Sequence, residues 1–309
     1  MNEQAGAEAA LAHIWAPLKR AMPDMARLDT MFLGGCCQGR SYSVDLGQYC
    51  GTLRGDWLGI PATNNTASLR YGEVFQIDAE GRVVQANLLW DALDVMRQAG
   101  VWPRAPSLGV EGIWPGPLTG DGLRMEPSDP ARGRASIEQT LRMHSALSEH
   151  DDRANLTRDA LIAMPQRDHW HPRMMWYGPA GIGTTRRLDG FVDGHKLPFR
   201  IAFHRPEGTF GKVTAERARH GAGHYIRIGD GPYSVTAGWS SVCATHLGGG
   251  FCGMPPSGRS VFVRVMDFYL HHDGLIRENW GPLDMLDLFR QMGVDLLGRM
   301  AGVLRRPAA

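Results

Sequence analysis

The chain has little cysteine, almost no net charge and no long apolar run. Its 309 residues include five cysteines, an odd number without a Cys-x-x-Cys pair, and Cys36 and Cys37 are adjacent. Adjacent cysteines do not bridge each other without strain. We therefore expect reduced, mostly buried thiols and a cytoplasmic protein. The formal net charge of +1 provides no basic field for nucleic acid, so we expect no nucleic-acid partner.

Membrane and export signals are also lacking. No apolar run approaches the roughly 20 residues that a membrane-spanning helix requires. The first residues begin acidic and lack the basic-then-apolar order of a secretion signal. We predict no membrane partner. The length suits two domains of ordinary size, and a hydrophobic content of 43% allows each domain to bury a core.

One stretch of sequence occurs twice. Gly59 to Gly100 and Gly253 to Gly293 both open with Gly-apolar-Pro and run through an apolar strand to a hairpin turn. Both continue with a second strand and a helix that ends in Arg-Gln-x-Gly, and one extra residue in the first hairpin keeps the copies in register. A repeat of this length indicates two copies of one structural unit. Because two copies are too few for a solenoid, we predict two fused domains.

The predicted elements divide the chain into three parts. Residues 1–100 form an abbreviated first domain that opens with a helix over Ala5 to Met22. Residues 101–135 are rich in proline and glycine and form a linker packed along the surface. Residues 136–309 form the complete second domain.

The second domain begins with helices and continues with strands. Ser136 and Gln139 form a capping box for its first helix. Strands joined by hairpin turns follow, and a last helix closes the unit. This order indicates an α+β fold rather than alternating βαβ units. The predicted strands are His224 to Ile228, Tyr233 to Val242, Ser260 to His271 and Leu275 to Trp280.

Several short sequence motifs of the second domain resemble those of one protein family. HWHPRMMWYGPAGIG, GMPP, HDGLIRENWGPLDM and FRQMG resemble SnoaL-like polyketide cyclases, within the NTF2-like superfamily. The resemblance covers residues 136–300 and, more weakly, residues 42–100. It implies two fused cone-shaped α+β barrels, the first abbreviated, in which a curved antiparallel sheet and helices enclose an apolar pocket. Family members pair through their sheets, so the resemblance also implies a pseudo-dimer within this chain and leaves further pairing of whole chains open.

The resemblance implies a reaction that needs no cofactor. The family's acid/base in aldol-type ring closure is an aspartate on the strand after the Asp-Gly hairpin, and that position is Gly281 here. A pocket histidine of the family aligns with Asp267, and with Glu73 in the first domain. Either the acid/base has moved to the neighbouring strand, or the aldol chemistry is absent.

Asp267 is the first candidate for acid/base catalysis. It lies in the otherwise apolar strand VFVRVMDFYLHH, where alternation places it on one face with Val265 and Tyr269. Apolar neighbours raise the pKa of a carboxyl group toward neutrality. Such a group can take a proton beside a carbonyl and return it later. The structural alternative is an ion pair with Arg264 or Arg277.

Histidines and aromatic residues are the candidates for substrate binding. His171 and His195 are expected to bind or polarise a substrate oxygen; the alternatives are a loop-fixing role for His171 and a core role for His195. His169 and His171 share a face, but no third ligand follows at a telling spacing, so we predict no metal. An apolar or aromatic ligand can stack on such side chains. The predicted substrate-binding residues are His169, Trp176, Tyr177, Trp239, Tyr269, Trp280 and Glu73.

These features favour a cofactor-independent enzyme that acts on a largely apolar carbonyl compound. Aldol-type cyclisation, retro-aldol cleavage, dehydration and isomerisation all need the same groups. Two alternatives stay open, because a fold alone does not decide function. One is a non-catalytic ligand-binding or scaffolding protein, which Gly281 favours; the other is a hydrolase whose carboxylates hold a water. The enzyme hypothesis requires Asp267, His171 and His195 to converge on one cavity.

Overall fold

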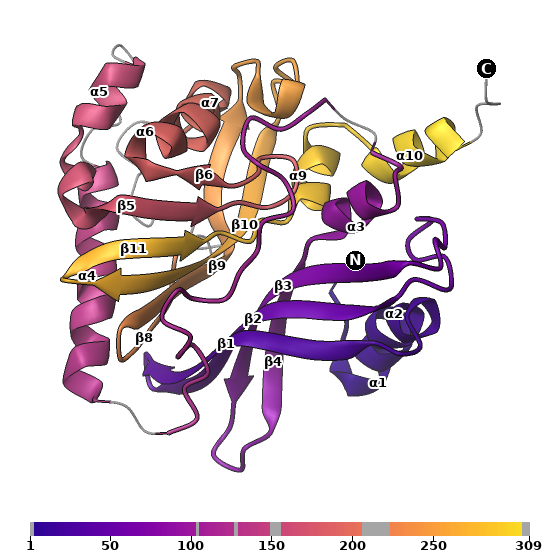
Figure 1. Ribbon diagram of the computed structural model, residues 1–309, viewed down its shortest axis with the longest axis horizontal. Helices are drawn as coiled ribbons and strands as arrows, with labels where there is room; N and C mark the ends of the chain where they lie inside the picture. Colours follow the sequence, from indigo (N-terminus) through magenta and orange to yellow (C-terminus); the bar gives the residue numbers. More distant parts are fainter. Residues whose placement is uncertain (1–2, 103–104, 127–128, 149–155, 206–222, 305–309) are drawn as a thin grey trace.

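Two curved β-sheets pack face to face in this protein (Figure 1). The computed structural model describes residues 3–102, 105–126, 129–148, 156–205 and 223–304. The first sheet has the order β1-β2-β3-β4, and the second has the order β6-β5-β11-β10-β9-β7, with β8 paired to β9. The α+β class is confirmed. Among the described residues, however, both sheets are open rather than closed into barrels.

The first unit consists of an N-terminal helix, four strands and a short helix. The predicted helix over Ala5 to Met22 is confirmed, and Leu18 within it is fully buried against the first sheet. The elements are α1 (Gly6–Ala10), the π-helical η1 (Leu11–Trp15), α2 (Ala16–Ala21), β1 (Ala26–Cys37), β2 (Arg40–Thr52), β3 (Thr66–Ile77), β4 (Val83–Trp90) and α3 (Ala92–Gln98).

The segment rich in proline and glycine runs in extended form along both sheets. Leu123 forms a β-bridge with Phe32 of the first sheet, and Val110 forms one with Thr184 of the second unit. This placement agrees with a linker that packs along the surface. The boundaries of the predicted domains stay a prediction.

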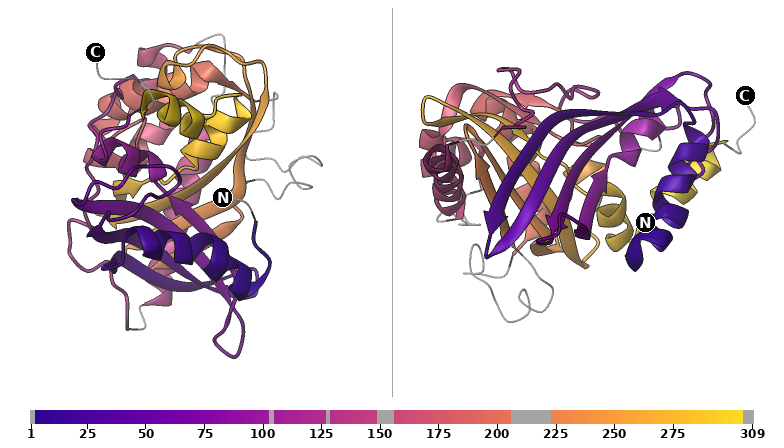
Figure 2. Two further views of the ribbon diagram at one scale, coloured as in Figure 1. Left: turned by 90° about the vertical axis from the view of Figure 1, so that its right-hand side faces the viewer. Right: turned by 90° about the horizontal axis from the view of Figure 1, so that it is seen from below.

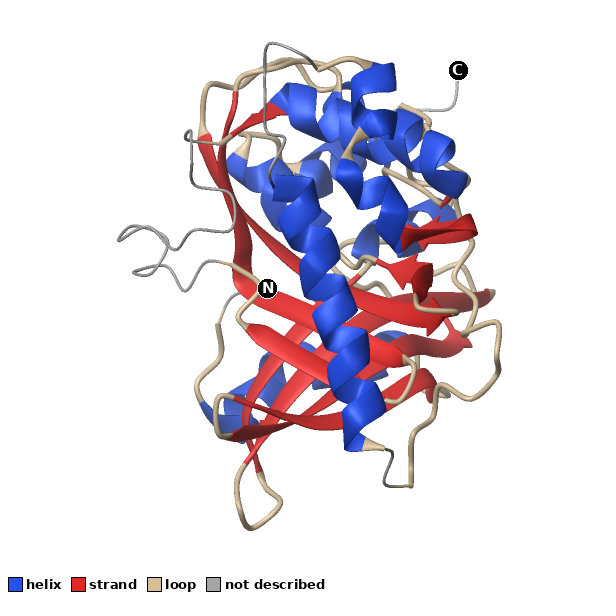
Figure 3. Ribbon diagram, turned by 90° about the vertical axis from the view of Figure 1, so that its left-hand side faces the viewer, coloured by secondary structure: helices blue, strands red, loops and turns tan. Residues whose placement is uncertain are grey.

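The first helix of the second unit begins earlier than predicted. Helix α4 spans Pro130–Ser148, and the side chain of Asp129 accepts a hydrogen bond from Ala131 N (2.8 Å). Asp-Pro at this point is the start signal, because aspartate caps a helix and proline is tolerated in its first turn. Ser136 lies inside the helix and donates to Gly231 O (2.7 Å), so the predicted capping box was wrong. Figure 3 shows α4 lying across the strands of the second sheet.

The four predicted strands of the second unit are confirmed as β8 to β11, although their ends differ by a few residues. Strand β5 pairs parallel to β11, and the other pairs in this sheet are antiparallel. No described helix combines the length and apolar character needed to cross a membrane. The remaining elements are α5 (Arg158–Ala163), η3 (Pro165–His169), β5 (Trp170–Tyr177), β6 (Thr185–Arg186), α6 (Arg187–Phe191), η4 (Val192–Lys196), α7 (Leu197–Ala202), β7 (Phe203–His204), β8 (Ile226–Asp230), β9 (Tyr233–His246), η5 (Phe251–Gly253), β10 (Ser260–His272), β11 (Leu275–Trp280), α9 (Met285–Gln291) and α10 (Leu296–Leu304).

The two copies of the sequence repeat form the same supersecondary structure, two strands followed by a helix. The first copy forms β3, β4 and α3, and the second forms β10, β11 and α9. Gln98 accepts from Ser68 N (2.8 Å) and donates to Ser68 O (2.7 Å). Gln291 makes the same pair of bonds with the backbone of Phe262 (2.7 and 3.0 Å). The glutamine of Arg-Gln-x-Gly therefore fastens each helix to the first strand of its hairpin.

The two units share an apolar core between their sheets. On β10, Met266, Phe268 and Leu270 point to one face, where they pack in a single cluster with residues of the first sheet such as Val44 and Leu46. Figure 2 shows the two sheets in contact along this face. Burying apolar surface here favours the packed arrangement. The opposite face of the second sheet packs against helices instead.

Candidate functional site

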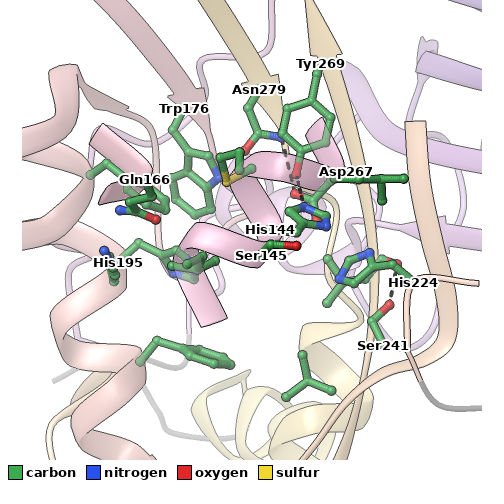
Figure 4. Close-up of a pocket in the computed structure, with 18 of the residues that line it drawn as sticks. His144, Ser145, Gln166, Trp176, His195, His224, Ser241, Asp267, Tyr269 and Asn279 are labelled. Carbon is green, nitrogen blue, oxygen red and sulfur yellow. Dashed lines mark hydrogen bonds between the residues drawn. The ribbon is translucent and has the colours of Figure 1, made fainter. Parts of the chain in front are cut away.

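A cavity of ≈ 560 Å³ lies between the second sheet and its covering helices. That volume falls within the roughly 300–1,000 Å³ of typical small-molecule sites. Side chains from α4, η3, β5 and the helices after β6 form part of its wall, and β9, β10 and β11 form the rest. Figure 4 shows the polar side chains that face it.

Asp267 borders this cavity from the middle of β10. Val265, Asp267 and Tyr269 all line it, so the face predicted by strand alternation is confirmed. Asn279 Nδ2 donates to Asp267 Oδ1 (3.2 Å). Burial raises the pKa of Asp267 to about 7, and the bond from Asn279 opposes that rise only in part. The carboxyl group is therefore able to change its protonation state near neutral pH.

The arginines that could have neutralised Asp267 bind elsewhere. Arg264 pairs with Asp284 (2.9 Å) and with Asp287 (3.6 Å). Arg277 donates to the backbone oxygen of Arg173. In the described part of the chain, no cationic side chain lies within ion-pair distance of Asp267. The ionised form of Asp267 thus has no local counter-charge.

Gly281 lies directly after β11, beside Asp267. A Cβ atom built at Gly281 would be 3.4 Å from Asp267 Oδ1 and 3.4 Å from Trp176 Nε1. These are ordinary contact distances, so a small side chain could be accommodated. A side chain at this position would begin beside the Asp267 carboxylate.

Tyr269 and His144 form a second polar pair in the cavity. Tyr269 Oη and His144 Nε2 are 3.0 Å apart. Burial lowers the pKa of His144 to about 4, assisted by the charge of Arg227, and burial raises the pKa of Tyr269 well above its usual value. Both side chains are uncharged at neutral pH. The Tyr269 hydroxyl, two residues from Asp267 on the same face, can donate a hydrogen bond to a ligand oxygen.

His195 and Trp176 form an aromatic wall. Their rings stack with centroids 4.3 Å apart and planes inclined by 13°. Burial lowers the pKa of His195 to about 3, so the imidazole is neutral. Figure 4 shows His195 on the opposite side of the view from Asp267, with Trp176 between them.

Four of the predicted site residues line this cavity, and six lie outside it. Asp267, His195, Trp176 and Tyr269 are inside. The structure does not place His171 with them: its Nδ1 accepts from Arg173 N (3.0 Å), which supports the loop-fixing alternative. The others outside the cavity are His169, Tyr177, Trp239, Trp280 and Glu73.

The residues outside have identifiable packing roles. Tyr177 and Trp280 stack on each other (5.0 Å) and point into the core between the sheets. Trp239 lies against the guanidinium of Arg264 (5.2 Å). His169 Nδ1 is 3.2 Å from the side-chain amide of Gln139. Among the described residues, no three His, Cys, Asp or Glu side chains are grouped as metal ligands.

Sequence reasoning missed several polar residues of the cavity. Asn279 could have been found, because it lies two residues before Gly281 and therefore on the same face of the chain as β11 ends. His144 lies on the cavity side of α4 together with Leu141 and Leu147, a spacing typical of one helix face. No local signal marked Gln166 or His224.

Glu73, the counterpart of Asp267, lies in a filled environment. It is 0% exposed, and its Oε2 accepts from Arg27 Nη1 (2.7 Å). Its Oε1 accepts from Tyr49 Oη (2.9 Å) and Trp90 Nε1 (2.8 Å). The Tyr49 ring packs against Tyr71 (4.7 Å) and Trp90 (5.6 Å). Rings and an ion pair thus surround Glu73.

Comparison with known proteins points to one family. Residues 231–292 match the family model described as SnoaL-like polyketide cyclase. This segment is SnoaL-like. It contains β9, β10, β11 and α9, and with them Asp267, Asn279 and Gly281, so the resemblance predicted from the motifs is confirmed here. No protein with a curated description matches the chain.

Similar solved structures cover about half of this chain. A candidate SnoaL-like polyketide cyclase from Jannaschia sp. CCS1 is 15% identical, with 55% of this chain and 98% of that chain covered and a TM-score of 0.36. TsrD from Streptomyces laurentii is 22% identical, with 52% and 96% covered and a TM-score of 0.33. A protein with a ketosteroid isomerase-like fold from Catenulispora acidiphila is 9% identical, with 50% and 94% covered and a TM-score of 0.33.

Proposed function

We propose that the protein is a cofactor-independent acid/base enzyme acting on a largely apolar carbonyl compound held in the cavity. The observation that carries the proposal is the state of Asp267. Its carboxyl group borders the cavity, accepts a hydrogen bond from Asn279 and has a pKa of about 7. A group with a pKa near the working pH is suited both to take and to return a proton.

The neighbouring side chains supply the other parts of such a reaction. Asp267 removes a proton from the carbon next to the carbonyl, and the electron pair of the broken C–H bond moves onto the carbonyl oxygen. Tyr269 donates a hydrogen bond to that oxygen and is held in place by His144. The developing negative charge is thereby stabilised. Return of the proton to a different carbon of a conjugated enolate gives isomerisation, and its delivery to a leaving hydroxyl group gives dehydration.

Aldol-type cyclisation and retro-aldol cleavage use the same enolate. The carbon skeleton of the substrate decides which reaction follows. Trp176 and His195 provide a flat wall on which an aromatic or polycyclic compound can stack. A Cβ atom at position 281 would lie 3.4 Å from the Asp267 carboxylate. In this proposal, β10 therefore supplies an acid/base close to the position that follows β11.

A substrate-independent test is the exchange of carbon-bound hydrogen. The hydrogens next to the carbonyl of 2-tetralone exchange with deuterium oxide when a base removes them, and NMR measures the rate. We expect catalysed exchange by the native protein and a loss of about 100-fold or more in Asp267→Asn, the usual scale of acid/base catalysis. Glu73→Gln is the matched control, because it changes the equivalent carboxylate outside the cavity.

The exchange rate should also depend on pH in a defined direction. The active form of the base is the ionised Asp267, so the rate should rise as pH passes through about 7 and level off above it.

A second candidate function is ligand binding without catalysis, which the glycine at position 281 favours. Absence of catalysed exchange in the native protein, for 2-tetralone and for cyclic 1,3-diketones, would contradict the enzyme proposal and support this alternative.

A further inference from the structure

One wall of the cavity carries polar groups without hydrogen-bond partners among the described residues. Gln166 is 0% exposed, yet neither its Oε1 nor its Nε2 is bonded. Trp170 is 6% exposed with an unbonded Nε1, and Nδ1 of His195 is unbonded as well. All three residues line the cavity. Most buried polar groups in proteins have a partner, so this grouping requires an explanation.

These three residues belong to one region of the cavity. The Phe191 ring lies 5.8 Å from the ring of Trp170 and 5.5 Å from that of His195. Gln166 lies on η3, which leads directly into Trp170 at the start of β5. Figure 4 shows Gln166 and His195 on the other side of Trp176 from Asp267. The cavity therefore has two polar ends with an indole between them.

The three residues with unbonded groups at the second end carry no charge. The Gln166 amide offers a donor and an acceptor, Trp170 offers a donor, and Nδ1 of uncharged His195 offers one or the other, according to its tautomer. Lys196 and Arg200 also line the cavity, and each donates to a backbone oxygen, at 3.2 Å and 2.7 Å respectively. An anion placed beside these three residues would be buried with hydrogen bonds but without a full counter-charge from them. An uncharged group that both donates and accepts matches them better.

We propose that Gln166, Trp170 and His195, which we call the amide wall, bind an uncharged donor–acceptor group at the end of the substrate remote from Asp267. A carboxamide, or a hydroxyl group beside a carbonyl, has this chemistry. The inference rests on the proposed function in one respect: the end of the substrate beside Asp267 is taken as the end that reacts. The substrate class is then an aromatic carbonyl compound with a second, neutral polar group, whose ring lies along Trp176.

The test uses naphthalene probes that share one ring system. Isothermal titration calorimetry on the full chain compares 2-naphthamide, 1-hydroxy-2-acetonaphthone, naphthalene-2-carboxylate and 2-methylnaphthalene. We expect at least one of the two neutral donor–acceptor probes to bind about five- to tenfold more tightly than 2-methylnaphthalene, the effect of about one net hydrogen bond. The tighter of the two identifies the group. Equal binding of all four probes, or a preference for the carboxylate, overturns the proposal.

Variants of the amide wall connect that preference to its residues. Gln166→Leu should reduce it to within about twofold while leaving the Kd of 2-methylnaphthalene unchanged. Circular dichroism checks that the variant is folded. His195→Phe keeps a ring against Trp176 but removes both nitrogens, so it tests the wall independently if Gln166→Leu does not fold. A preference that survives in both folded variants also overturns the proposal.

Asp267→Asn separates this inference from the proposed function. It alters the other end of the cavity, so it should leave the probe preference unchanged while abolishing hydrogen exchange. If the preference is absent and exchange persists, the amide wall is wrong and the enzyme proposal stands. If exchange is absent and the preference persists, the enzyme proposal is wrong and the wall stands as a binding site.

Discussion

Asp267 and Glu73 occupy equivalent positions in the two copies of the repeat but have opposite surroundings. Asp267 borders an open cavity and has one hydrogen bond from an amide. Glu73 is fully buried, paired with Arg27 and bonded by two aromatic side chains. The repeat places both carboxylates on the same strand face. Segments outside the repeat decide whether the carboxylate meets a ligand or a guanidinium.

The covering elements explain this difference. In the first unit, one N-terminal helix packs on the sheet, and Trp15 contacts both Tyr49 (5.6 Å) and Trp90 (5.0 Å) near Glu73. In the second unit, several helices cover the sheet and leave ≈ 560 Å³ between them and the strands. The helices α4, α6 and α7 have no counterpart in the described part of the first unit, and they line the helical side of the cavity.

The comparison predicts opposite stability changes for the two carboxylates, and this is the largest effect. Glu73→Gln removes the partner of Arg27 in a buried ion pair, and we expect a loss of about 2–3 kcal/mol. The loss is smaller than for a fully buried pair because Arg27 retains solvent contact, and because burial raises the pKa of Glu73 and so already disfavours its ionised form. Asp267→Asn should instead stabilise the protein at pH 8. Denaturant unfolding of both variants measures the two free energies.

The sign for Asp267 follows from proton binding. Its pKa is about 7 in the folded protein, against the 3.8 of a solvated aspartate, so between these values the folded protein holds a proton that the unfolded chain has lost. Wild-type stability therefore falls as pH rises from about 4 to 7, whereas that of Asp267→Asn does not. The fall is at most about 4 kcal/mol and is reduced by the partial exposure of Asp267 beside the cavity. At pH 3 the variant and the native protein should be closely similar. A variant less stable than the native protein at pH 8 would contradict this expectation.

Moving the carboxylate between strands sharpens the comparison. In Asp267→Asn the exchange activity should be lost, and adding Gly281→Asp should restore part of it, to within about 10–100-fold of the native rate, because a Cβ atom at position 281 lies beside the side chain of residue 267. Gly281→Asn in the same background is the control without a base. Equal rates for the two double variants would show that the positions do not share a function.

The contact between the units predicts an intermediate effect. Gly72 on β3 approaches the second unit so closely that a Cβ atom would lie 2.8 Å from Pro282 Cγ and 3.2 Å from Phe268. Gly72→Ala should cost about 1–2 kcal/mol through overpacking. Gly34→Ala is the matched control on β1, where a Cβ atom has no neighbour within 4 Å. Thermal unfolding of both variants tests whether the two sheets are packed as described.

The shared part of the two copies predicts the smallest effect. Gln98→Ala and Gln291→Ala each remove two bonds to a strand backbone, and we expect each to cost about 1 kcal/mol. The two losses should be similar, because the bonds have the same geometry in both units. Chemical unfolding provides the measurement. Markedly unequal losses would mean that the two copies share sequence and geometry but that their equivalent bonds do not contribute equally to the free energy of unfolding.

Local signals predicted much of the fold. The alternating pattern and the Asp273-Gly274 turn located β10 and β11, since a strand's side-chain period and a left-handed turn leave a mark in the sequence. Strands β1 and β2 were not predicted, because their sequences are rich in glycine and polar residues. Tertiary packing against the second sheet stabilises them instead.

The site was less predictable than the fold. Asp267 could be found because it interrupts an apolar strand. The positions of His144 and Gln166 depend on how α4 and η3 pack against β9, β10 and β11, which begin more than 60 residues later in the chain. His171 carried a family-like motif, but its ring bonds to its own backbone segment. Motifs identified the strand that carries the site, and only the packing identified the groups around it.

The core between the two sheets has a consequence for how the protein responds to concentration. When two separate chains cover each other's apolar sheet, dilution separates them and their melting temperature falls. Here the covering sheet is part of the same polypeptide, and the segment from residue 105 to 126 runs along both. The back of the strand that carries Asp267 therefore stays dry at any concentration at which the chain is folded.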